Sequence, residues 1–468
     1  MPRVSLFPVA SHRSSRAVFT PPRLKTAKKP NLCFSTTPLL LRRKMHCVAG
    51  SSSESNPLTT MEADDVEDES HPLLMMEADE EDEDGMSLCV FYDIQNKEDV
   101  NTNIEIPEEV KHAICVGSSH GWLAYVSRLD CSVFLWSPFN TSPLILLPPI
   151  DTLPYVTVVS SEELDENEYK PDFVSAYEDD FSPDFGFKIS CDCVHPDICQ
   201  VHRIISPKLL SLRIMVKIVL SSSPTSDDCV VVAVPRHNIR RSIAFCKPGD
   251  KAWTFVDPPL QNGFHSISDV IHFKDRLFYT VSSCGTGLYA YDLSDLSSPK
   301  SYLLETSFNF QTLSSFDQNV RTWFHDRYYL VESLGDLLWV RRLISNNMND
   351  DGEFTFSHDA QIFPDQTVQF DVYRLDFSKN TWEFTESIGD RVLFLGTNQS
   401  LSLSARDFPS LKANCIYFTD DSSSIHRKCD FGGRDFGYYE LGGFAYGEYR
   451  FREDKILPPP FWVMRHFQ

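Results

Sequence analysis

Short runs of aromatic and β-branched residues alternate along most of the chain with turns of Gly, Asn, Asp and Ser. The segments FKDRLFYTVSSCGTGLYAYDLSD, RYYLVESLGDLLWVRRLI and FDVYRLDFSKNTWEF each contain two apolar runs on either side of such a turn. This pattern is typical of β-hairpins. Comparable units begin near residues 119, 214, 271, 327, 368 and 388, with no amphipathic helical pattern between them. The sequence therefore predicts an all-β fold.

Two all-β architectures compete for a chain of this length. A sandwich of two facing sheets rarely needs so many residues, whereas a β-propeller repeats a four-stranded blade about every 40–50 residues. Dividing residues 87–468 by about 50 residues per blade gives roughly seven blades. We therefore expect a kelch-like β-propeller of roughly six to eight blades, with a disordered N-terminal extension.

Steps from an acidic residue to an aromatic one, as in AYDLSD, YRLDFSKNTW and KPGDKAW, suit kelch-like blades. In such blades the tryptophan packs between neighbouring blades, but ordinary packing in a core explains the same pattern. Because aromatic side chains are usually buried, we interpret Trp253 and Trp382 as core residues.

The N-terminal residues 1–50 contain ten Lys or Arg and no Asp or Glu, and they are rich in Ser, Thr and Pro. An Arg-rich, Ser-rich and acid-poor leader is typical of organellar transit peptides, and we predict one over residues 1–50. The composition does not distinguish a mitochondrion from a chloroplast. The alternatives are a disordered basic tail, or a true start at Met45 in a protein of the cytoplasm or nucleus.

Residues 51–86 reverse the sign of the charge. Fourteen acidic residues and no Lys or Arg fall between residues 51 and 84, mainly in MEADDVEDES and EADEEDED. Like charges at this density repel one another and resist packing, so residues 51–86 are predicted to be a disordered acidic linker. The folded region, residues 87–468, is expected to begin at the apolar run SLCVFYDI near Ser87.

The formal net charge of −23 argues against binding to nucleic acid, because affinity for phosphate backbones comes from Lys and Arg. A protein partner with a basic surface suits this charge better. The longest apolar runs, such as PLILLPPI, are far shorter than the roughly 20 residues of a membrane helix, so no membrane span is expected. The 13 cysteines lack the dense spacing of a small secreted disulfide scaffold and are predicted to be free thiols.

Several segments resemble the plant KIB-type β-propeller family, whose members often follow an F-box. VGSSHGWLAYVSRLDCSVFLWSPFNTSPLILLPP resembles its opening blade, ISDVIHFKDRLFYTV its middle, and SIGDRVLFLGTNQSLSLSARDFPSLKANCIYFTDD its most distinctive late segment. The resemblance covers most of residues 72–468. It implies a kelch-like propeller that recognises proteins, and in many members a substrate receptor of a ubiquitin ligase that binds a Skp-type adaptor through its F-box.

Residues 1–84 lack the helical apolar periodicity of an F-box, so no Skp-type adaptor is expected as a partner. The layout resembles a branch of the family with an organellar leader and no F-box. The first hypothesis is therefore a non-enzymatic protein-interaction propeller of unknown partner in a plant organelle. The alternative is a relative of ubiquitin-ligase receptors in the cytosol or nucleus, whose F-box is lost or missing from the gene model.

The sequence contains no phosphate-binding glycine loop, nucleophile elbow or HExxH metal motif, so no enzyme activity, catalytic residue or cofactor is predicted. Asp420 and Asp421 are adjacent acids, which could serve acid–base chemistry if one were buried, but the following SSS predicts a solvated hairpin turn. Cys415 alternates with Ile416 and Tyr417 in a strand pattern and is predicted to be a buried structural thiol.

The stretch CDCVHPDICQVH is the candidate metal site. It contains five residues of types that bind zinc, namely Cys191, Cys193, His195, Cys199 and His202. The alternation in FGFKISCDC predicts a half-buried strand that runs into the two leading cysteines. On a straight strand these residues stand about 6.6 Å apart, whereas two sulfurs on one zinc lie about 3.8 Å apart. Zinc binding, and a metal-dependent enzyme built on it, is therefore the least favoured hypothesis.

This cluster lies within residues 160–206, an acidic and Cys-rich stretch between the first blade and the next family-like segment. We expect an inserted loop there. Loops carried on a rigid scaffold often provide recognition residues, so the insertion is a candidate recognition element.

Overall fold

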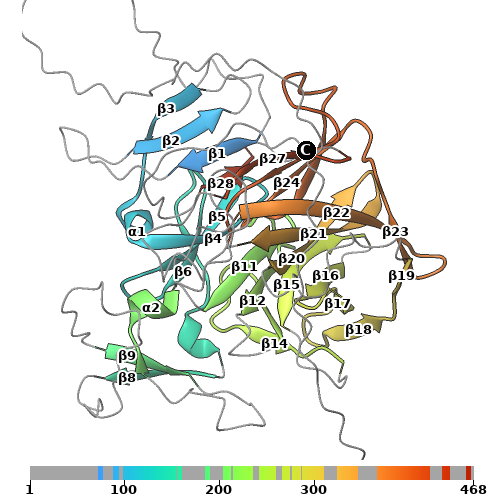
Figure 1. Cartoon of the computed structure of the whole chain (residues 1–468). Coiled ribbons are helices and arrows are strands. Elements are labelled where there is room, and N and C mark those ends of the chain that lie inside the picture. The colour runs from blue at the N-terminus through green and yellow to red at the C-terminus, as the bar shows by residue number, and fades with distance from the viewer. Residues whose placement is uncertain are drawn as a thin grey trace, which may run out of the picture. The chain divides into compact units, whose positions relative to one another are not determined.

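The structure is a computed structural model. It describes residues 72–76, 88–93, 98–153, 155–160, 185–189, 204–211, 214–235, 242–259, 266–274, 277–285, 287–309, 324–345, 366–421, 435–442 and 460–464 (Figure 1). All of these residues belong to one compact unit, Glu67–Gln468.

Six sheets form the six blades of a β-propeller, which confirms the predicted all-β architecture. Three blades use consecutive antiparallel strands. Blade one contains β4 (Ala113–Ser119), β5 (Trp122–Ser127), β6 (Val133–Trp136) and β7 (Ile145–Leu146). Blade two contains β11 (Met215–Leu220), β12 (Val231–Pro235), β13 (Ile243–Cys246) and β14 (Thr254–Val256). Blade three contains β15 (Ile267–Phe273), β16 (Leu277–Ser282), β17 (Leu288–Asp292) and β18 (Lys300–Leu304).

The next two blades each include a parallel strand pair. Blade four contains β20 (Phe324–Ser333), β21 (Asp336–Ser345), β22 (Gln366–Asp376) and β23 (Thr381–Phe384), and β19 (Ser307–Asn309) joins its edge parallel to β23. Blade five contains β24 (Arg391–Leu395), β25 (Leu401–Ser404), β26 (Cys415–Phe418) and β27 (Gly437–Glu440), with β24 parallel to β26. The hairpin unit near residue 368 is therefore part of blade four rather than a separate blade.

Blade six combines both ends of the described chain. Its strand order is β28 (Phe461–Val463), β1 (Leu73–Met76), β2 (Leu88–Asp93) and β3 (Glu98–Glu105). In Figure 1 the dark red β28 lies beside the blue β1 and β2. The predicted disordered linker, residues 51–86, is thus wrong for Leu73–Met76, because the apolar run LLMM pairs with strands on both sides. The blade count falls within the expected range, below the value of seven that length alone suggested.

A smaller three-stranded sheet lies outside the blades. It contains β8 (Val156–Ser160), β9 (Phe185–Ile189) and β10 (Ile204–Ile205). Most of this sheet comes from the stretch 160–206. The strand predicted in FGFKISCDC is confirmed over its described residues, which form β9. Phe187 is buried in the core beside blades one and two. The stretch expected as an inserted loop therefore contains the predicted strand β9 and also β10, which was not predicted.

Helices are few and short in the described chain: α1 (Glu108–Lys111), the 3-10 helix η1 (Ile150–Thr152) and α2 (Pro207–Ser211). None of the helices among the described residues has the length and apolar character needed to span a membrane.

The hairpin turns follow the sequence pattern closely. In the segment SLGD, Leu334 and Gly335 join β20 to β21 with φ angles of 54° and 81°. Two successive positive φ angles define the type I′ turn, whose twist matches that of the flanking strands. Strand register is fixed there from Ser333 opposite Asp336 outward.

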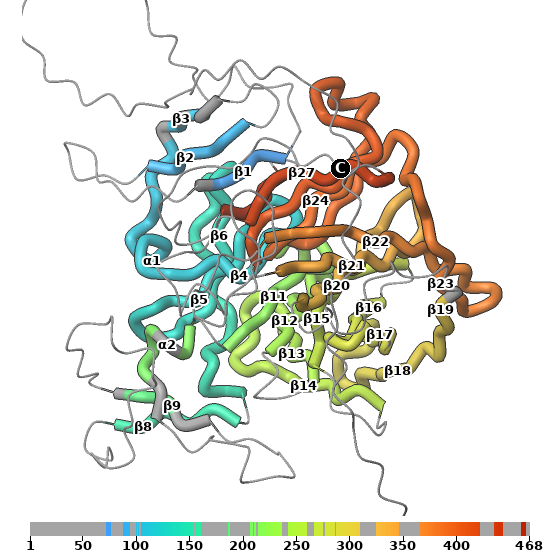
Figure 2. The backbone as a smooth tube through the Cα atoms, viewed as in Figure 1, coloured from blue at the N-terminus to red at the C-terminus, as the bar shows by residue number. Residues whose placement is uncertain are grey.

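The core lies between the blades, because each blade buries both of its faces. Six hydrophobic clusters occupy the six junctions between successive blades, and the cluster between blades six and one closes the series. Towards the centre, β4 contacts β11, β11 contacts β15, β15 contacts β20 and β28 contacts β4. Figure 2 follows the backbone through this series of sheets. The blades therefore form a closed ring.

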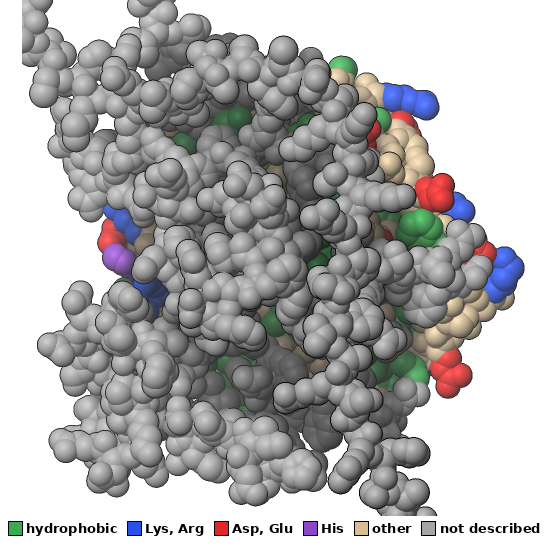
Figure 3. Space-filling view, in the orientation of Figure 1, with side chains coloured by type: hydrophobic (Ala, Val, Ile, Leu, Met, Phe, Trp, Pro, Cys, Tyr) green, Lys and Arg blue, Asp and Glu red, His purple; other side chains and the backbone are tan. Residues whose placement is uncertain are grey.

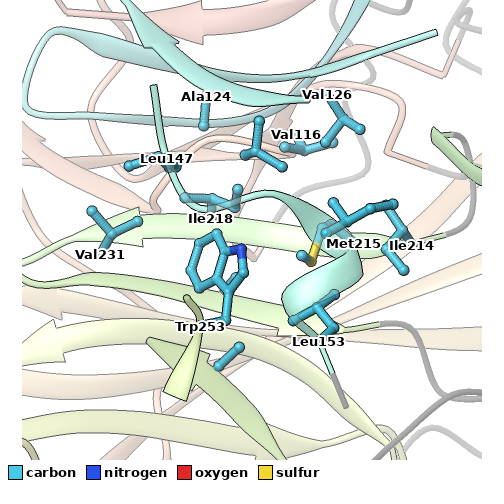
Figure 4. Close-up of a cluster of buried hydrophobic side chains, with 14 of the residues drawn as sticks. Val116, Ala124, Val126, Leu147, Leu153, Ile214, Met215, Ile218, Val231 and Trp253 are labelled. Carbon is cyan, nitrogen blue, oxygen red and sulfur yellow. The ribbon is translucent and has the colours of Figure 1, made fainter. Parts of the chain in front are cut away.

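The junction between blades one and two illustrates this packing (Figure 4). The indole of Trp253 lies against Ile218 and Val231, and its Nε1 donates a hydrogen bond of 2.8 Å to the carbonyl of Pro148 at the end of blade one. Trp382 is fully buried at the junction of blades three and four. Both tryptophans are core residues, as predicted, and the core they fill is the space between blades.

Candidate functional site

The Cys/His cluster that the sequence singled out lies outside the described residues. Cys191, Cys193, His195, Cys199 and His202 all follow β9 in the stretch between Ile189 and Ile204. The zinc hypothesis therefore stays a prediction. Within the part of the chain that the structure describes, no group of three or more His, Cys, Asp or Glu side chains is placed to hold a metal ion.

A polar segment of blade five, residues 396–400 (GTNQS), links β24 to β25 and lies among the inner strands of the ring. The backbone N–H of Gln399 donates to the carbonyl of Ser118 at 2.7 Å, and its Oε1 accepts a hydrogen bond of 2.5 Å from the hydroxyl of Ser119. Ser400 lies 3.5 Å from the carboxylate of Asp269. Since these partners belong to blades one and three, the segment connects strands across the centre of the ring.

A buried ion pair lies beside this segment. Nζ of Lys217 on β11 is 2.5 Å from Oδ1 of Asp269 on β15, and the two side chains are 4% and 1% exposed. The second carboxylate oxygen accepts a hydrogen bond of 2.9 Å from the backbone N–H of Leu330 on β20. Burial raises the pKa of Asp269, and the ammonium of Lys217 opposes that shift. The pair joins the inner strands of blades two, three and four.

A second group of buried charges lies between blades four and five, centred on Arg342 of β21. Its guanidinium donates to Thr367 Oγ1 at 2.7 Å, to the carbonyl of Thr419 at 2.8 Å and to Asp435 Oδ2 at 2.8 Å. A further bond of 3.2 Å reaches the hydroxyl of Tyr329. Burial would lower the pKa of Arg342, but Tyr329 and the aspartates raise it overall, so the side chain stays charged.

The aspartates at the end of β26 belong to this group. Asp420 is buried and Asp421 is 11% exposed, so the prediction of a solvated turn at these residues is wrong. Tyr329 donates to Asp421 Oδ2 at 3.0 Å, and Nε of Arg327 lies 3.4 Å from Oδ1. The residues SSS that follow Asp421 indicated a solvated turn. The arginines that interact with these aspartates lie on another blade, so the local sequence does not indicate the burial.

The neighbouring Arg341 points to the opposite face of blade four, because successive residues of a strand alternate sides. Its guanidinium bonds Asp326 at 2.9 Å and lies 3.3 Å from Asp371. Both of these carboxylates belong to strands of blade four, so Arg341 links strands within one blade, whereas Arg342 links blades four and five.

These arrangements favour structural roles over catalysis. The buried ion pairs described above join strands of one blade or of neighbouring blades. Cys415 is fully buried, as predicted, and burial raises the pKa of its thiol to about 11. Because the thiolate is the nucleophilic form, burial disfavours a nucleophilic role for this cysteine.

The sequence interpretation missed Lys217, Asp269 and Arg342. Each is a charged residue inside an otherwise apolar strand, in the segments MVKIVL, ISDVIHF and LLWVRRLIS. A charge in such a strand is costly to bury unless it is paired, so the pattern could have indicated buried ion pairs, though not which residues pair.

The exposed apolar residues lie mainly at turns and edges. Leu334, at the turn between β20 and β21, is 75% exposed. Phe377 follows β22 at the same end of blade four, is partly exposed, and stacks on Phe273 of blade three with the ammonium of Lys274 5.5 Å from its ring centroid. In the view of Figure 3, acidic and basic side chains interleave along the right-hand edge of the molecule.

Removing one partner of the central ion pair should destabilise the ring. Asp269→Asn leaves the Lys217 ammonium buried without its counter-charge, and we expect the free energy of unfolding to fall by about 3–5 kcal/mol in denaturant titrations. The double variant Lys217→Met, Asp269→Leu should recover most of this loss. The control Asp376→Asn removes the charge from a pair whose lysine is 64% exposed and should cost at most about 1 kcal/mol. Equal losses for the two Asp→Asn variants would contradict the assigned role.

Arg342 should not tolerate lysine, although the charge is retained. A lysine has three donors on one nitrogen and cannot reproduce the planar fork that bonds Thr367, Thr419 and Asp435 together. We expect Arg342→Lys to cost about 2 kcal/mol or more in unfolding titrations. The matched change Arg406→Lys, at a side chain that is 82% exposed, should be nearly neutral. A neutral effect at both positions would show that the buried fork is dispensable.

Known proteins from Arabidopsis thaliana resemble parts of this chain. The protein At5g55150, named as a candidate F-box protein, is 29% identical over 223 residues, which cover 47% of this chain and 53% of that protein. The F-box protein SKIP23 is 26% identical over 246 residues, which cover 49% of this chain and 53% of that protein. The matched region thus spans about half the length of these relatives.

Likeness to solved structures is distant. A protein from Lactobacillus plantarum aligns with 69% of this chain at 10% identity and a TM-score of 0.29, values too low to support an argument about function. The family comparison is far more extensive: the model described as the KIB1-4 beta-propeller matches residues 91–440, which include blades one to five and part of blade six. The chain therefore belongs to the KIB1-4 β-propeller family.

Proposed function

We propose that this propeller is a non-enzymatic platform that binds another protein. The proposal rests on where two kinds of residue lie. Lys217, Asp269 and Arg342 are buried and link strands of the ring, whereas apolar residues such as Leu334 are exposed at hairpin turns. Turns on a rigid scaffold are where binding residues concentrate. Membership of the KIB1-4 family, with relatives named as F-box proteins, supports a role in protein recognition.

The charge of the chain supports a partner with a basic surface. At −23, the formal net charge would speed the approach of such a partner and disfavour acidic ones. Association driven in this way weakens as salt screens the charges.

The site of action we propose is a mitochondrion or a chloroplast. Its support is the composition of residues 1–50, which contain ten basic and no acidic residues and are rich in Ser and Thr.

Binding can be tested by quantitative affinity capture with the full-length chain. We expect specific protein partners whose recovery falls several-fold between low and physiological salt. The double variant Leu334→Ser, Phe377→Ser should reduce recovery. Leu146→Ser serves as the matched control, because this leucine of β7 in blade one is 67% exposed, against 75% for Leu334. If no protein is enriched over a propeller of unrelated sequence, the platform proposal fails. Stoichiometric recovery of a Skp-type adaptor would instead support the role of ubiquitin-ligase receptor.

The location can be tested separately by fusing residues 1–60 to a fluorescent protein in plant cells. The proposal predicts fluorescence confined to mitochondria or chloroplasts. Replacing the ten basic residues of the leader with glutamine should abolish that targeting, because import relies on positive charge. A diffuse signal from the unaltered fusion would contradict the organellar location.

A further inference from the structure

Leu334 is an unusual residue for the turn that it occupies. With Gly335 it forms the centre of the type I′ turn between β20 and β21, where the two φ angles are 54° and 81°. Both central positions of this turn need a positive φ, which glycine, asparagine and aspartate adopt readily. The Cβ atom of a leucine crowds the backbone in this conformation, so the turn holds strain at Leu334.

The other non-glycine residues of the described chain with a positive φ fall into two groups. Some are of types enriched in this conformation, and these are His120, Asn380 and Asn414. The rest are compensated by side-chain contacts. Cys131, with a φ of 60°, is 1% exposed, and its thiol donates a hydrogen bond of 3.2 Å to the carbonyl of Pro207. Lys274, with a φ of 25°, holds its ammonium 5.0 Å from the ring centroid of Phe273.

Leu334 belongs to neither group. Leucine is not a type that favours a positive φ, and the side chain of Leu334 is 75% exposed, the largest exposed fraction among the large apolar residues that the structure describes. The turn therefore combines backbone strain with apolar surface in water, and both are unfavourable for the chain alone. Burial of Leu334 against another molecule would offset them.

Two carboxylates flank Leu334 along the chain. Glu332 is exposed, and its Oε1 accepts a hydrogen bond of 2.7 Å from the backbone N–H of Gly335. Asp336 is 48% exposed, and Nη1 of Arg374 lies 3.6 Å from its Oδ2. The turn itself contains no basic residue. Because charges at the rim of an interface select a partner of the opposite sign, this turn suits a partner with Lys or Arg beside its apolar contact.

A second apolar side chain extends this surface. Phe377 follows β22, which lies beside β21 (Figure 1). It is 40% exposed, and its ring stacks on Phe273 with the centroids 6.3 Å apart. Since β21 begins at the end of blade four where β22 ends, the turns that carry Leu334 and Phe377 lie at the same end of the blade. A segment bound at Leu334 can therefore extend towards Phe377.

We propose that Leu334 is the anchor through which the propeller binds a protein partner, and that the partner supplies a segment of apolar residues flanked by Lys or Arg. The apolar residues cover Leu334, and the basic residues face Glu332 and Asp336. The anchor rests on the proposed function, that the propeller binds a protein, and gives that function a place and a partner chemistry. Stability and binding then make opposite demands on residue 334, because relieving the strain removes the anchor.

Replacing the leucine tests the strain. Asparagine adopts a positive φ more readily than leucine, so Leu334→Asn should raise the melting temperature of the full-length chain by about 1–2 °C. The control Leu129→Asn changes a leucine that is 61% exposed in the turn between β5 and β6, where its φ is not positive, and should bring no rise. A lower melting temperature for Leu334→Asn than for the unaltered chain would show that Leu334 supports the fold, and would overturn the strained anchor.

Random peptides displayed on phage test the chemistry of the partner. The library is selected on the immobilised full-length chain at low salt. Enriched peptides should combine apolar residues with several Lys or Arg. Their affinity should fall by about ten-fold or more for Leu334→Asn, and by less than about two-fold for Leu129→Asn. Enrichment of acidic peptides, of peptides that bind both variants equally well, or of no peptides at all would overturn the proposal.

Glu332→Gln tests the charged rim. Glutamine keeps an oxygen that can accept the hydrogen bond from Gly335 but removes the charge. The affinity of the selected peptides should fall about two- to five-fold at low salt and should then depend less on salt. The control Glu109→Gln, at an exposed residue of α1, should change neither quantity. An unchanged salt dependence for Glu332→Gln would overturn the basic character of the bound segment.

Affinity capture separates the anchor from the function on which it rests. The unaltered chain and Leu334→Asn are used in parallel on extracts of plant cells, and recovery of the same partners should fall about five-fold or more for the variant. Equal recovery would overturn the anchor and leave the protein-binding function standing. Recovery of no partner by the unaltered chain would contradict that function itself.

Discussion

The structure depends on a single constraint: each blade is apolar on both faces and must be covered on both. A lone four-stranded sheet of this kind would expose two hydrophobic surfaces, and only a closed ring covers every face. The whole domain therefore requires a closed ring, and closure depends on the blade in which the two ends of the described chain pair. In this protein that blade depends on β1, which lies ahead of the region matched to the family.

The buried charges can be understood within the same constraint. Burying Lys217, Asp269 and Arg342 costs desolvation energy that their partners only partly offset, so these groups are weak evidence for extra stability. Their partners lie on other strands, and often on other blades, so an ion pair forms only when the strands meet in the correct register. Hydrophobic clusters alone would tolerate small shifts between blades, whereas a buried ion pair does not. We infer that these buried ion pairs fix the alignment of the strands and blades that they join.

Much of the fold could be predicted from the sequence because hairpins are local. The turn at Leu334–Gly335 and the strands around it follow from neighbouring residues alone. Ring closure could not be predicted in this way, because β1 and β28 are almost 400 residues apart. In addition, the acidic residues on both sides of Leu73–Met76 predict disorder for the whole segment, despite its four apolar residues. The burial of Asp421 was missed for a similar reason, since its arginine partners are on a different blade. The zinc ligands proposed at Cys191 and Cys193 stay a prediction.

The most direct test of ring closure is a disulfide between its two ends. Met75 and Phe461 are opposite one another in antiparallel strands, where Cα atoms lie about 4.5–5.5 Å apart, within the range of a disulfide. In the double variant Met75→Cys, Phe461→Cys, mild oxidation should yield a cross-linked peptide joining the two positions, identified by mass spectrometry. We expect this peptide in high yield and its absence from a Leu58→Cys, Phe461→Cys control. No cross-link between residues 75 and 461, or equal yields in both variants, would contradict a ring closed by β1.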